Sequence, residues 1–252
     1  MITVASVSKS YGRERVVDDV SIEFGAVGVT SIIGPNGAGK STLLGMIARL
    51  IPTDVGAITI DGHDVHTTPT ATLATRVAVL RQDNHLTARL TVRDLVGFGR
   101  YPYSKGRLTV EDQNIIERSL AYLDLAALES RFLDELSGGQ RQRAFIAMVL
   151  AQDTDYVLLD EPLNSLDVKH AVDIMRLLRR TAIETGKRIV IVVHDINFAS
   201  VHSDEIIAMK DGRVVAHGTP LEVMQSDVLG SLYEVDVDVR DIDGQRIALY
   251  YG

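Results

Sequence analysis

The 252-residue sequence contains no cysteine and no tryptophan. Without cysteine the chain can form neither a disulfide framework nor a thiolate metal site, which fits a reducing compartment. Long hydrophobic runs are also missing, since stretches such as residues 189–193 are far too short to cross a bilayer. The first residues lack the apolar segment of a secretory signal peptide. We therefore expect a soluble protein that meets a membrane only through a partner.

An excess of positive charge is missing as well. The sequence has 26 lysines and arginines against 34 aspartates and glutamates, giving a net charge of −8. This balance argues against nucleic acid as a partner. No internal repeat, low-complexity tract or flexible linker divides the sequence. A chain of this length can bury a substantial core, so we expect a single domain over residues 1–252.

Short runs rich in β-branched residues recur along the chain and alternate in part with helical patterns. The helical patterns begin at Lys40 and cover residues 169–184. Apolar runs without alternation are typical of strands buried on both faces of a parallel sheet. The sequence thus predicts an α/β fold with strands in residues 2–7, 29–33, 57–60, 77–80, 156–160 and 188–193.

The segment from about residue 85 to 153 contains no strong strand pattern. Within it, Thr109 precedes Asp112 by the spacing of a capping box, and apolar residues follow at helical intervals. We predict a helical subdomain inserted into the sheet domain. Residues 235–252 alternate between apolar and polar types around a glycine-containing turn, which predicts a small hairpin at an edge of the fold.

The sequence GPNGAGKS, residues 34–41, fits the phosphate-binding loop pattern G-x-x-x-x-G-K-[ST]. Its glycines permit a tight loop whose N–H groups point at phosphate oxygens, and the following helix adds a favourable dipole. Lys40 would supply a cation to the terminal phosphates. Ser41 would offer a hydroxyl to Mg²⁺, which prefers oxygen ligands. A glycine-rich turn before a helix is the alternative, but the combination of strand, loop, lysine and helix favours a P-loop.

Polar residues follow other predicted strands at the same edge of the sheet. Asp160 ends the run YVLLD and suits a role near Mg²⁺, and Glu161 beside it suits polarising the attacking water. His194 follows the next predicted strand, where it could contact the terminal phosphate. Gln82 closes another run and could reach Mg²⁺ or water through its amide oxygen, although Asp83 could do the same.

A second anion-binding pattern, LSGGQRQR, occupies residues 136–143. Ser137 can cap a helix, and the glycines after it let backbone N–H groups approach a ligand closely. The pattern predicts one helix over residues 138–151 that must run back before the strand at 156–160. We therefore expect its N-terminus to lie far from the carboxyl end of that strand. The simplest resolution is a two-fold dimer, in which each LSGGQ closes over the nucleotide bound by the other chain.

These motifs, in this order and spacing, resemble those of ATP-binding cassette (ABC) ATPases: GPNGAGKS, Gln82, LSGGQ, YVLLDEP, the SLD of residues 165–167, and His194. The resemblance covers nearly the whole chain. It implies a RecA-like P-loop core, an antiparallel β arm and an inserted helical subdomain. It also implies a homodimer docked on two integral membrane permease subunits at the cytoplasmic face of the membrane.

The resemblance assigns roles residue by residue. Glu161, His194 and Lys40 would be catalytic, and Asp167 would belong to a loop that crosses the dimer. Mg²⁺ would lie near Ser41, Gln82 and, through water, Asp160. The signature residues that contact the partner's ATP would be Ser137, Gly138, Gly139 and Gln140. The residues implied to bind ATP are Tyr11, whose ring would stack on adenine, and Gly34, Pro35, Asn36, Gly37, Ala38, Gly39, Lys40, Ser41, Thr42, Gln82 and Asp160.

A narrower resemblance links residues 97–112, 161–180 and 192–212 to the ATPase subunits of iron–siderophore importers, especially those serving catecholate-type siderophores. That group also contains haem and cobalamin importers, and it works with an external substrate-binding protein. The GRYPY of residues 99–103 concentrates tyrosines beside Arg100, which suits either a protein interface or local packing. A soluble ABC ATPase of DNA repair is the rival, but its long heptad insertion is absent between residues 41 and 136.

Overall fold

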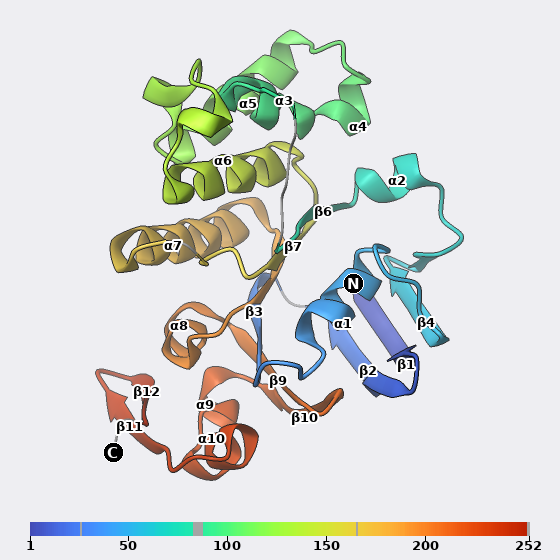
Figure 1. Ribbon diagram of the computed structural model, residues 1–252, viewed down its shortest axis with the longest axis vertical. Coiled ribbons are helices and arrows are strands. Elements are labelled where there is room, and N and C mark those ends of the chain that lie inside the picture. The colour runs from blue at the N-terminus through green and yellow to red at the C-terminus, as the bar shows by residue number, and fades with distance from the viewer. Residues whose placement is uncertain (26, 83–87, 165, 251–252) are drawn as a thin grey trace.

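A six-stranded sheet forms the centre of the computed structural model, which describes residues 1–25, 27–82, 88–164 and 166–250 (Figure 1). Its neighbours pair in parallel, except for one antiparallel pair at an edge. In spatial order the strands are β10 (Arg213–Gly218), β9 (Glu205–Lys210), β3 (Gly28–Ile33), β8 (Arg188–Val192), β7 (Tyr156–Asp160) and β6 (Val77–Leu80). Their near-continuous burial agrees with the parallel strands that the apolar runs predict.

Helices connect many of the strands. They are α1 (Lys40–Ile47), α2 (Thr70–Ala74), α3 (Val92–Phe98), α4 (Tyr101–Ser104), α5 (Val110–Tyr122), α6 (Gly138–Ala151), α7 (Val168–Thr185), α8 (Ile196–His202), α9 (Pro220–Val223) and α10 (Ser226–Tyr233). The predicted starts of α1, α5 and α6 are confirmed, the last two by capping boxes at Thr109 and Ser137. Among the described residues, no helix combines the length and the hydrophobicity needed to cross a bilayer.

Two hydrophobic clusters cover the two faces of the sheet. Alternate residues of a strand contribute to each, so that Leu159 packs with the large helices while Leu158 packs with α1 and an antiparallel arm. The chain between β6 and β7 forms α3, α4, α5 and α6, which lie together at the top of Figure 1. The division of the chain at residues 85 and 153 stays a prediction, and residues 85–87 lie outside the described residues.

The antiparallel arm consists of β2 (Glu14–Phe24), β1 (Ile2–Tyr11), β4 (Val55–Ile60) and β5 (His63–Asp64), in that spatial order. The sequence patterns at residues 2–7 and 57–60 predicted strands of the parallel sheet, and this was wrong. Both strands bury alternate residues, such as Ile58 and Ile60, and leave Thr59 half-buried. Threonine is β-branched like isoleucine and valine, so a threonine on the outer face made the alternation of buried and exposed positions hard to recognise in the sequence. The arm that the family resemblance implied is present.

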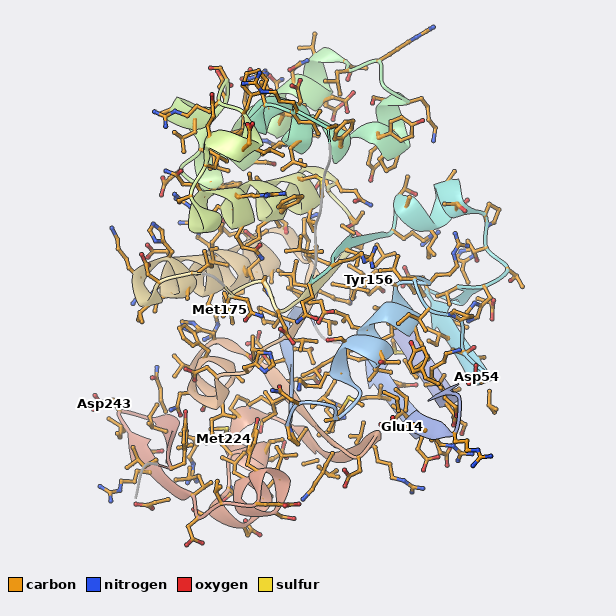
Figure 2. The ribbon with its side chains drawn as sticks, viewed as in Figure 1. Glu14, Asp54, Tyr156, Met175, Met224 and Asp243 are labelled. Atoms are coloured by element: carbon orange, nitrogen blue, oxygen red, sulfur yellow. The ribbon has the colours of Figure 1, made fainter. Side chains whose placement is uncertain are left out.

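The arm meets the core sheet at a polar junction around Asp61, in the turn after β4. Its carboxylate accepts a hydrogen bond from the Tyr156 hydroxyl at 2.5 Å and pairs with Arg76 at 3.2 Å. Burial, followed by the neighbouring Asp61, raises the pKa of Tyr156 to about 12. Figure 2 shows Tyr156 at the boundary between the central sheet and the arm. The neutral phenol therefore serves as a fixed donor that orients the arm against β7.

The alternating tail forms the hairpin β11 (Asp238–Ile242) and β12 (Gln245–Leu249), as the pattern predicted. The amide group of Asn197 in α8 fastens it, accepting from the Ala248 N–H at 2.8 Å and donating to the Ala248 carbonyl at 3.2 Å. Residues 251–252 of the predicted range lie outside the described residues. The hairpin thus closes one end of the fold beside α8 (Figure 1).

Arg100 joins three helices of the segment between β6 and β7. Its Nε donates to Asp112 Oδ1 at 2.8 Å and its Nη1 donates to the carbonyl of Ala151, at the end of α6, at 3.0 Å. Both charged side chains are buried. Hydrogen bonds from the Thr109 backbone and from Arg100 hold the pKa of Asp112 below its ordinary value. The sequence left open whether the cluster around Arg100 forms a protein interface or packs locally. Arg100 itself packs locally.

We predict that Arg100→Met destabilises the protein by about 3–5 kcal/mol, because it leaves the Asp112 carboxylate buried without its cation. Urea unfolding of this variant should be compared with that of Arg118→Met, which removes an exposed arginine from α5. Since Asp112 has a lowered pKa in the folded state, its contribution is present at neutral pH and lost as pH falls below its ordinary pKa of 3.8. The gap between the wild type and Arg100→Met should therefore narrow in acid. Equal stability of the two arginine variants at pH 7 would contradict this account.

Candidate nucleotide site

The predicted site residues gather at one edge of the central sheet, because its parallel strands end there together. Ile32 of β3 lies opposite Val192 of β8, and Val192 lies opposite Asp160 of β7. The P-loop follows β3, Glu161 follows β7, and His194 comes two residues after β8. Gln82 follows β6 at the same edge. Segments far apart in sequence thus deliver an ammonium, carboxylates, an imidazole and an amide to one place.

The P-loop backbone approaches its neighbours too closely for any side chain at two of its glycines. A Cβ on Gly34, which has φ +145°, would lie 2.0 Å from the carbonyl oxygen of Met209. A Cβ on Gly39, with φ +93°, would lie 2.4 Å from the carbonyl oxygen of Val16. Gly39 also forms the N-cap of α1 in the left-handed region. The loop is therefore wedged between β9 and the arm, and its backbone is held ready to bind an anion.

Lys40 begins α1 and is buried. Its ammonium donates to the carbonyl oxygens of Gly34 and Pro35, both at 2.8 Å. Burial lowers the pKa of Lys40, and the carboxylates of Glu161 and Asp160 oppose that effect. A buried ammonium enclosed by the P-loop attracts a negatively charged oxygen more strongly than an exposed one would.

Ser41 and Asp160 form the second contact of the site. The Ser41 hydroxyl donates to Asp160 Oδ1 at 2.8 Å across the intervening strand β8. Burial raises the pKa of Asp160, while the hydrogen bond from Ser41 works in the other direction. A cavity of about 300 Å³ opens beside Ser41, Thr42, Gln82 and Asp160. Its polar lining includes hydroxyl, amide and carboxylate oxygens, which are hard ligands that suit Mg²⁺, and also Arg81.

Glu161 occupies a strained backbone position, with φ +49°. Three donors surround its carboxylate. His194 Nε2 lies 2.8 Å from Oε1, while Gln82 Nε2 donates to Oε2 at 2.9 Å and Asn164 Nδ2 donates to the same oxygen at 2.6 Å. The side chain of Glu161 is only 8% exposed, against 42% for that of His194. The carboxylate is thus fixed in direction and shielded from bulk water.

The structure therefore brings together the predicted residues Lys40, Ser41, Gln82, Asp160, Glu161 and His194. Tyr11 ends β1 with 52% of its surface exposed, and the Lys9 ammonium lies 5.7 Å from its ring centre. No contact among the described residues joins Tyr11 to the P-loop. Asp83, the alternative to Gln82, lies outside the described residues, as does Ser165.

The second anion-binding pattern lies apart from this group. Ser137 caps α6, its hydroxyl accepting from the Gln140 N–H at 3.3 Å, and Gln140 Oε1 accepts from the Ser137 N–H at 3.0 Å. Ser137 and Gly138 are exposed, Gly139 is half-buried, and none of these residues contacts the P-loop among the described residues. The start of α6 thus presents backbone N–H groups on the surface.

The place where this helix begins differs from what the sequence predicted. The helix runs back before β7 as expected, but we also expected its N-terminus to lie far from the carboxyl end of β7, and this was wrong. Gln142, in the second turn of α6, donates to the carbonyl of Pro162 at 3.0 Å, just beyond Glu161. A helix that leads into a strand through a short loop must begin at the edge where that strand ends. The signature and the P-loop therefore lie at the same edge of the sheet, but α6 packs in the hydrophobic cluster on one face and α1 in the cluster on the other.

Two further residues complete the description. Asp167 caps α7, accepting from the His170 N–H at 2.8 Å, and lies exposed at the end of the turn that follows Glu161. Asn164, in the same turn, was not among the predicted site residues. An amide three residues after Glu161 in a tight turn was a signal that it could reach back to the carboxylate.

Comparison with known proteins identifies the family of this chain and full-length relatives. The chain matches the family described as ABC transporter over residues 17–164. It is 52% identical to the petrobactin import ATP-binding protein YclP of Bacillus subtilis (strain 168), over the full length of both chains. It is 54% identical to the petrobactin import ATP-binding protein FatE of Bacillus anthracis, over 99% of this chain and 100% of that one.

Among solved structures, the dimeric bacterial ABC transporter cassette MJ0796 superposes with a TM-score of 0.79 at 30% sequence identity. The match covers 87% of this chain and 99% of that one. The family match, the full-length relatives and the fold agree with one another. The chain belongs to the ABC transporter family and is an ATP-hydrolysing cassette.

Proposed function

We propose that this protein is the nucleotide-binding subunit of an importer that takes up iron–siderophore complexes, and that ATP hydrolysis at Glu161 drives it. The observation that carries the proposal is the shielded Glu161 carboxylate, held beside the P-loop within reach of Gln82 and His194. The petrobactin import names of two full-length relatives support the substrate class. Haem or cobalamin import is the alternative within the same transporter group.

ATP binding uses the P-loop and the ring of Tyr11. The terminal phosphates lie against the loop N–H groups and the Lys40 ammonium, and Ser41 and Thr42 extend the contacts at the start of α1. The adenine stacks on Tyr11, whose exposed ring offers a flat aromatic surface to a base. Lys40 is suited to this role because its cation is already desolvated and faces no carboxylate within hydrogen-bonding distance among the described residues.

The donor set beside the P-loop fits Mg²⁺. Ser41, Gln82 and, through water, Asp160 would hold it, and it would neutralise charge on the terminal phosphates. Asp160 keeps Ser41 oriented through their hydrogen bond. Glu161 orients the attacking water through its carboxylate, and His194 contacts the terminal phosphate. Its imidazole already lies 2.8 Å from Glu161, so both groups act on the same small volume.

The exposed signature supports a two-fold dimer. Ser137, Gly138, Gly139 and Gln140 present an anion-binding helix start that contacts no P-loop residue of its own chain among the described residues. In a homodimer they close over the ATP bound by the partner, with Asp167 in the loop that crosses between chains. The dimeric cassette MJ0796 is a structural neighbour of this chain. Each complete site then needs both copies.

The membrane partner docks on a groove between α3, α4 and α5. This groove of about 450 Å³ is lined by Phe98, Tyr101, Leu108 and Ile116, and the first three are exposed. Apolar and aromatic surface of this kind suits a protein interface. We propose that two permease subunits each bind one cassette here, at the cytoplasmic face of the membrane, with a substrate-binding protein on the outer side.

Glu161→Gln should bind ATP but fail to hydrolyse it, because the amide keeps the shape and loses the carboxylate that orients water. A dimer that is normally transient should then accumulate, with about twice the monomer mass in gel filtration with ATP and Mg²⁺, and monomer without ATP. Adding Ser137→Arg should abolish this dimer, since bulk and charge block the partner's phosphates. Adding Ser130→Arg, which places the same side chain at an exposed site away from the helix start, should leave the dimer intact.

Two outcomes would count against this prediction. Wild-type turnover in Glu161→Gln would remove Glu161 from the chemistry. A dimer that survives Ser137→Arg would show that the signature does not close over nucleotide.

Phe98→Ala combined with Tyr101→Ala should weaken association with the membrane subunits and leave the ATPase activity of the isolated cassette unchanged. Tyr103 is left in place because its ring packs under Arg100, with the guanidinium carbon 4.2 Å from the ring centre. Co-purification from detergent-solubilised membranes measures the effect. Leu221→Ala, at an exposed apolar residue of α9, is the control. Wild-type recovery of the membrane subunits by the double variant would place the interface elsewhere.

A further inference from the structure

Asn164 makes the shortest contact to the Glu161 carboxylate. Its Nδ2 donates to Oε2 at 2.6 Å, compared with 2.9 Å for Gln82 on the same oxygen and 2.8 Å for His194 on Oε1. Asn164 is itself exposed and makes no other side-chain hydrogen bond within the described residues. Within the described residues, Glu161 is therefore the one side-chain partner that the Asn164 amide has.

The three donors differ in how they are attached. Gln82 comes from the segment after β6 and His194 from the segment after β8, so neither shares a backbone turn with Glu161. Asn164 belongs to the same tight turn, in which its N–H donates to the Glu161 carbonyl at 3.3 Å. Under the proposed function, Gln82 and His194 turn to Mg²⁺ and phosphate during turnover. Asn164 then remains hydrogen-bonded to Glu161, because both residues belong to the same turn.

The two carboxylate oxygens are consequently unequal. Asn164 engages Oε2 and leaves Oε1, which His194 faces, as the oxygen available to a water molecule. A side-chain amide neither gives nor takes a proton at neutral pH, so Asn164 can fix the carboxylate without competing as a base. Fixing it also helps offset the strained backbone at Glu161, whose φ of +49° is uncommon for a residue with a Cβ.

We propose that Asn164 is a positioning residue for ATP hydrolysis, which holds Glu161 Oε2 so that Oε1 points at the attacking water. This inference rests on the role proposed for Glu161. Charge also matters, because Lys40, Asp160 and His194 surround the same carboxylate. A further negative group there would repel Glu161 and Asp160. A neutral donor is the side chain that the position accommodates best.

The test compares Asn164→Leu with Asn164→Asp in the full-length protein. Leucine approximates the shape and removes the donor, whereas aspartate keeps the shape and the turn-forming tendency but presents an acceptor and a like charge to Glu161. If Asn164 only shapes the turn, aspartate should be the milder change. If Asn164 positions Glu161, aspartate should be the more damaging change.

We expect kcat to fall about tenfold in Asn164→Leu, the scale of a mispositioned catalytic group, and further in Asn164→Asp. KM for ATP should stay within about twofold in both variants, because the P-loop is untouched. Asn114→Leu, at an exposed asparagine of α5, is the matched control and should retain wild-type kinetics. Thermal unfolding measures stability in parallel, and similar melting temperatures should accompany the loss of kcat.

The outcomes separate this inference from the proposed function. Two results would overturn the positioning role: a wild-type kcat in Asn164→Leu, or a smaller loss of kcat in Asn164→Asp than in Asn164→Leu. If Glu161→Gln is still inactive in either case, the proposed function stands. Full activity of Glu161→Gln would overturn the proposed chemistry itself. A rise in KM equal to the fall in kcat/KM would mean that Asn164 contributes to binding ATP, and would also overturn the inference.

Discussion

The parallel register of β3, β8 and β7 is the constraint on which the rest of the site depends. Ser41 lies in α1, which the P-loop joins to β3, and Asp160 ends β7. The strands β3 and β7 are not neighbours, yet the two side chains are hydrogen-bonded across β8. A slip of one residue in either pairing would turn alternate side chains to the opposite face and exchange the two hydrophobic clusters. Register is therefore enforced by the core, and it sets which strand ends meet at the site, while the P-loop glycines and the turn after Glu161 fix the local geometry there.

The second feature that organises the site is the balance of its buried charges. Lys40 and Asp160 are both desolvated, which lowers the pKa of the first and raises that of the second. Each of these charges is stabilised by the other, and Glu161 adds a further negative charge that donors from three segments hold in place. The side chains that face Glu161 could equally donate hydrogen bonds to phosphate oxygens. Under the proposed function, binding of ATP exchanges the hydrogen bonds from Gln82 and His194 to Glu161 for contacts with Mg²⁺ and phosphate, while Asn164 keeps its hydrogen bond to Glu161.

Much of this arrangement could be predicted from sequence because it depends on local chemistry. The P-loop, the ends of β7 and β8 and the capped starts of α5 and α6 are each encoded within a few residues. What the sequence did not reveal depends on contacts between distant segments. The strands at residues 2–7 and 57–60 look like buried parallel strands until their pairing is known. Arg100 looks exposed until Asp112 and the end of α6 enclose it. Asn164 looks incidental until its turn folds back onto Glu161.

The same long-range contacts bear on how hydrolysis could be coupled to a membrane partner. Residues of α3, α5 and α6 share one hydrophobic cluster, and Arg100 ties the start of α4 both to Asp112 in α5 and to the carbonyl at the end of α6. The groove formed by α3, α4 and α5 and the signature at the start of α6 therefore belong to one packed body. A body of this kind transmits displacement because its close-packed interior hardly deforms. Under the proposed function, closing the signature over the partner's ATP must move the groove as well, and with it whatever is docked there. The buried Arg100–Asp112 pair is then more than a stabilising contact, since it keeps the binding surface for the membrane subunit in a fixed relation to the surface that senses nucleotide.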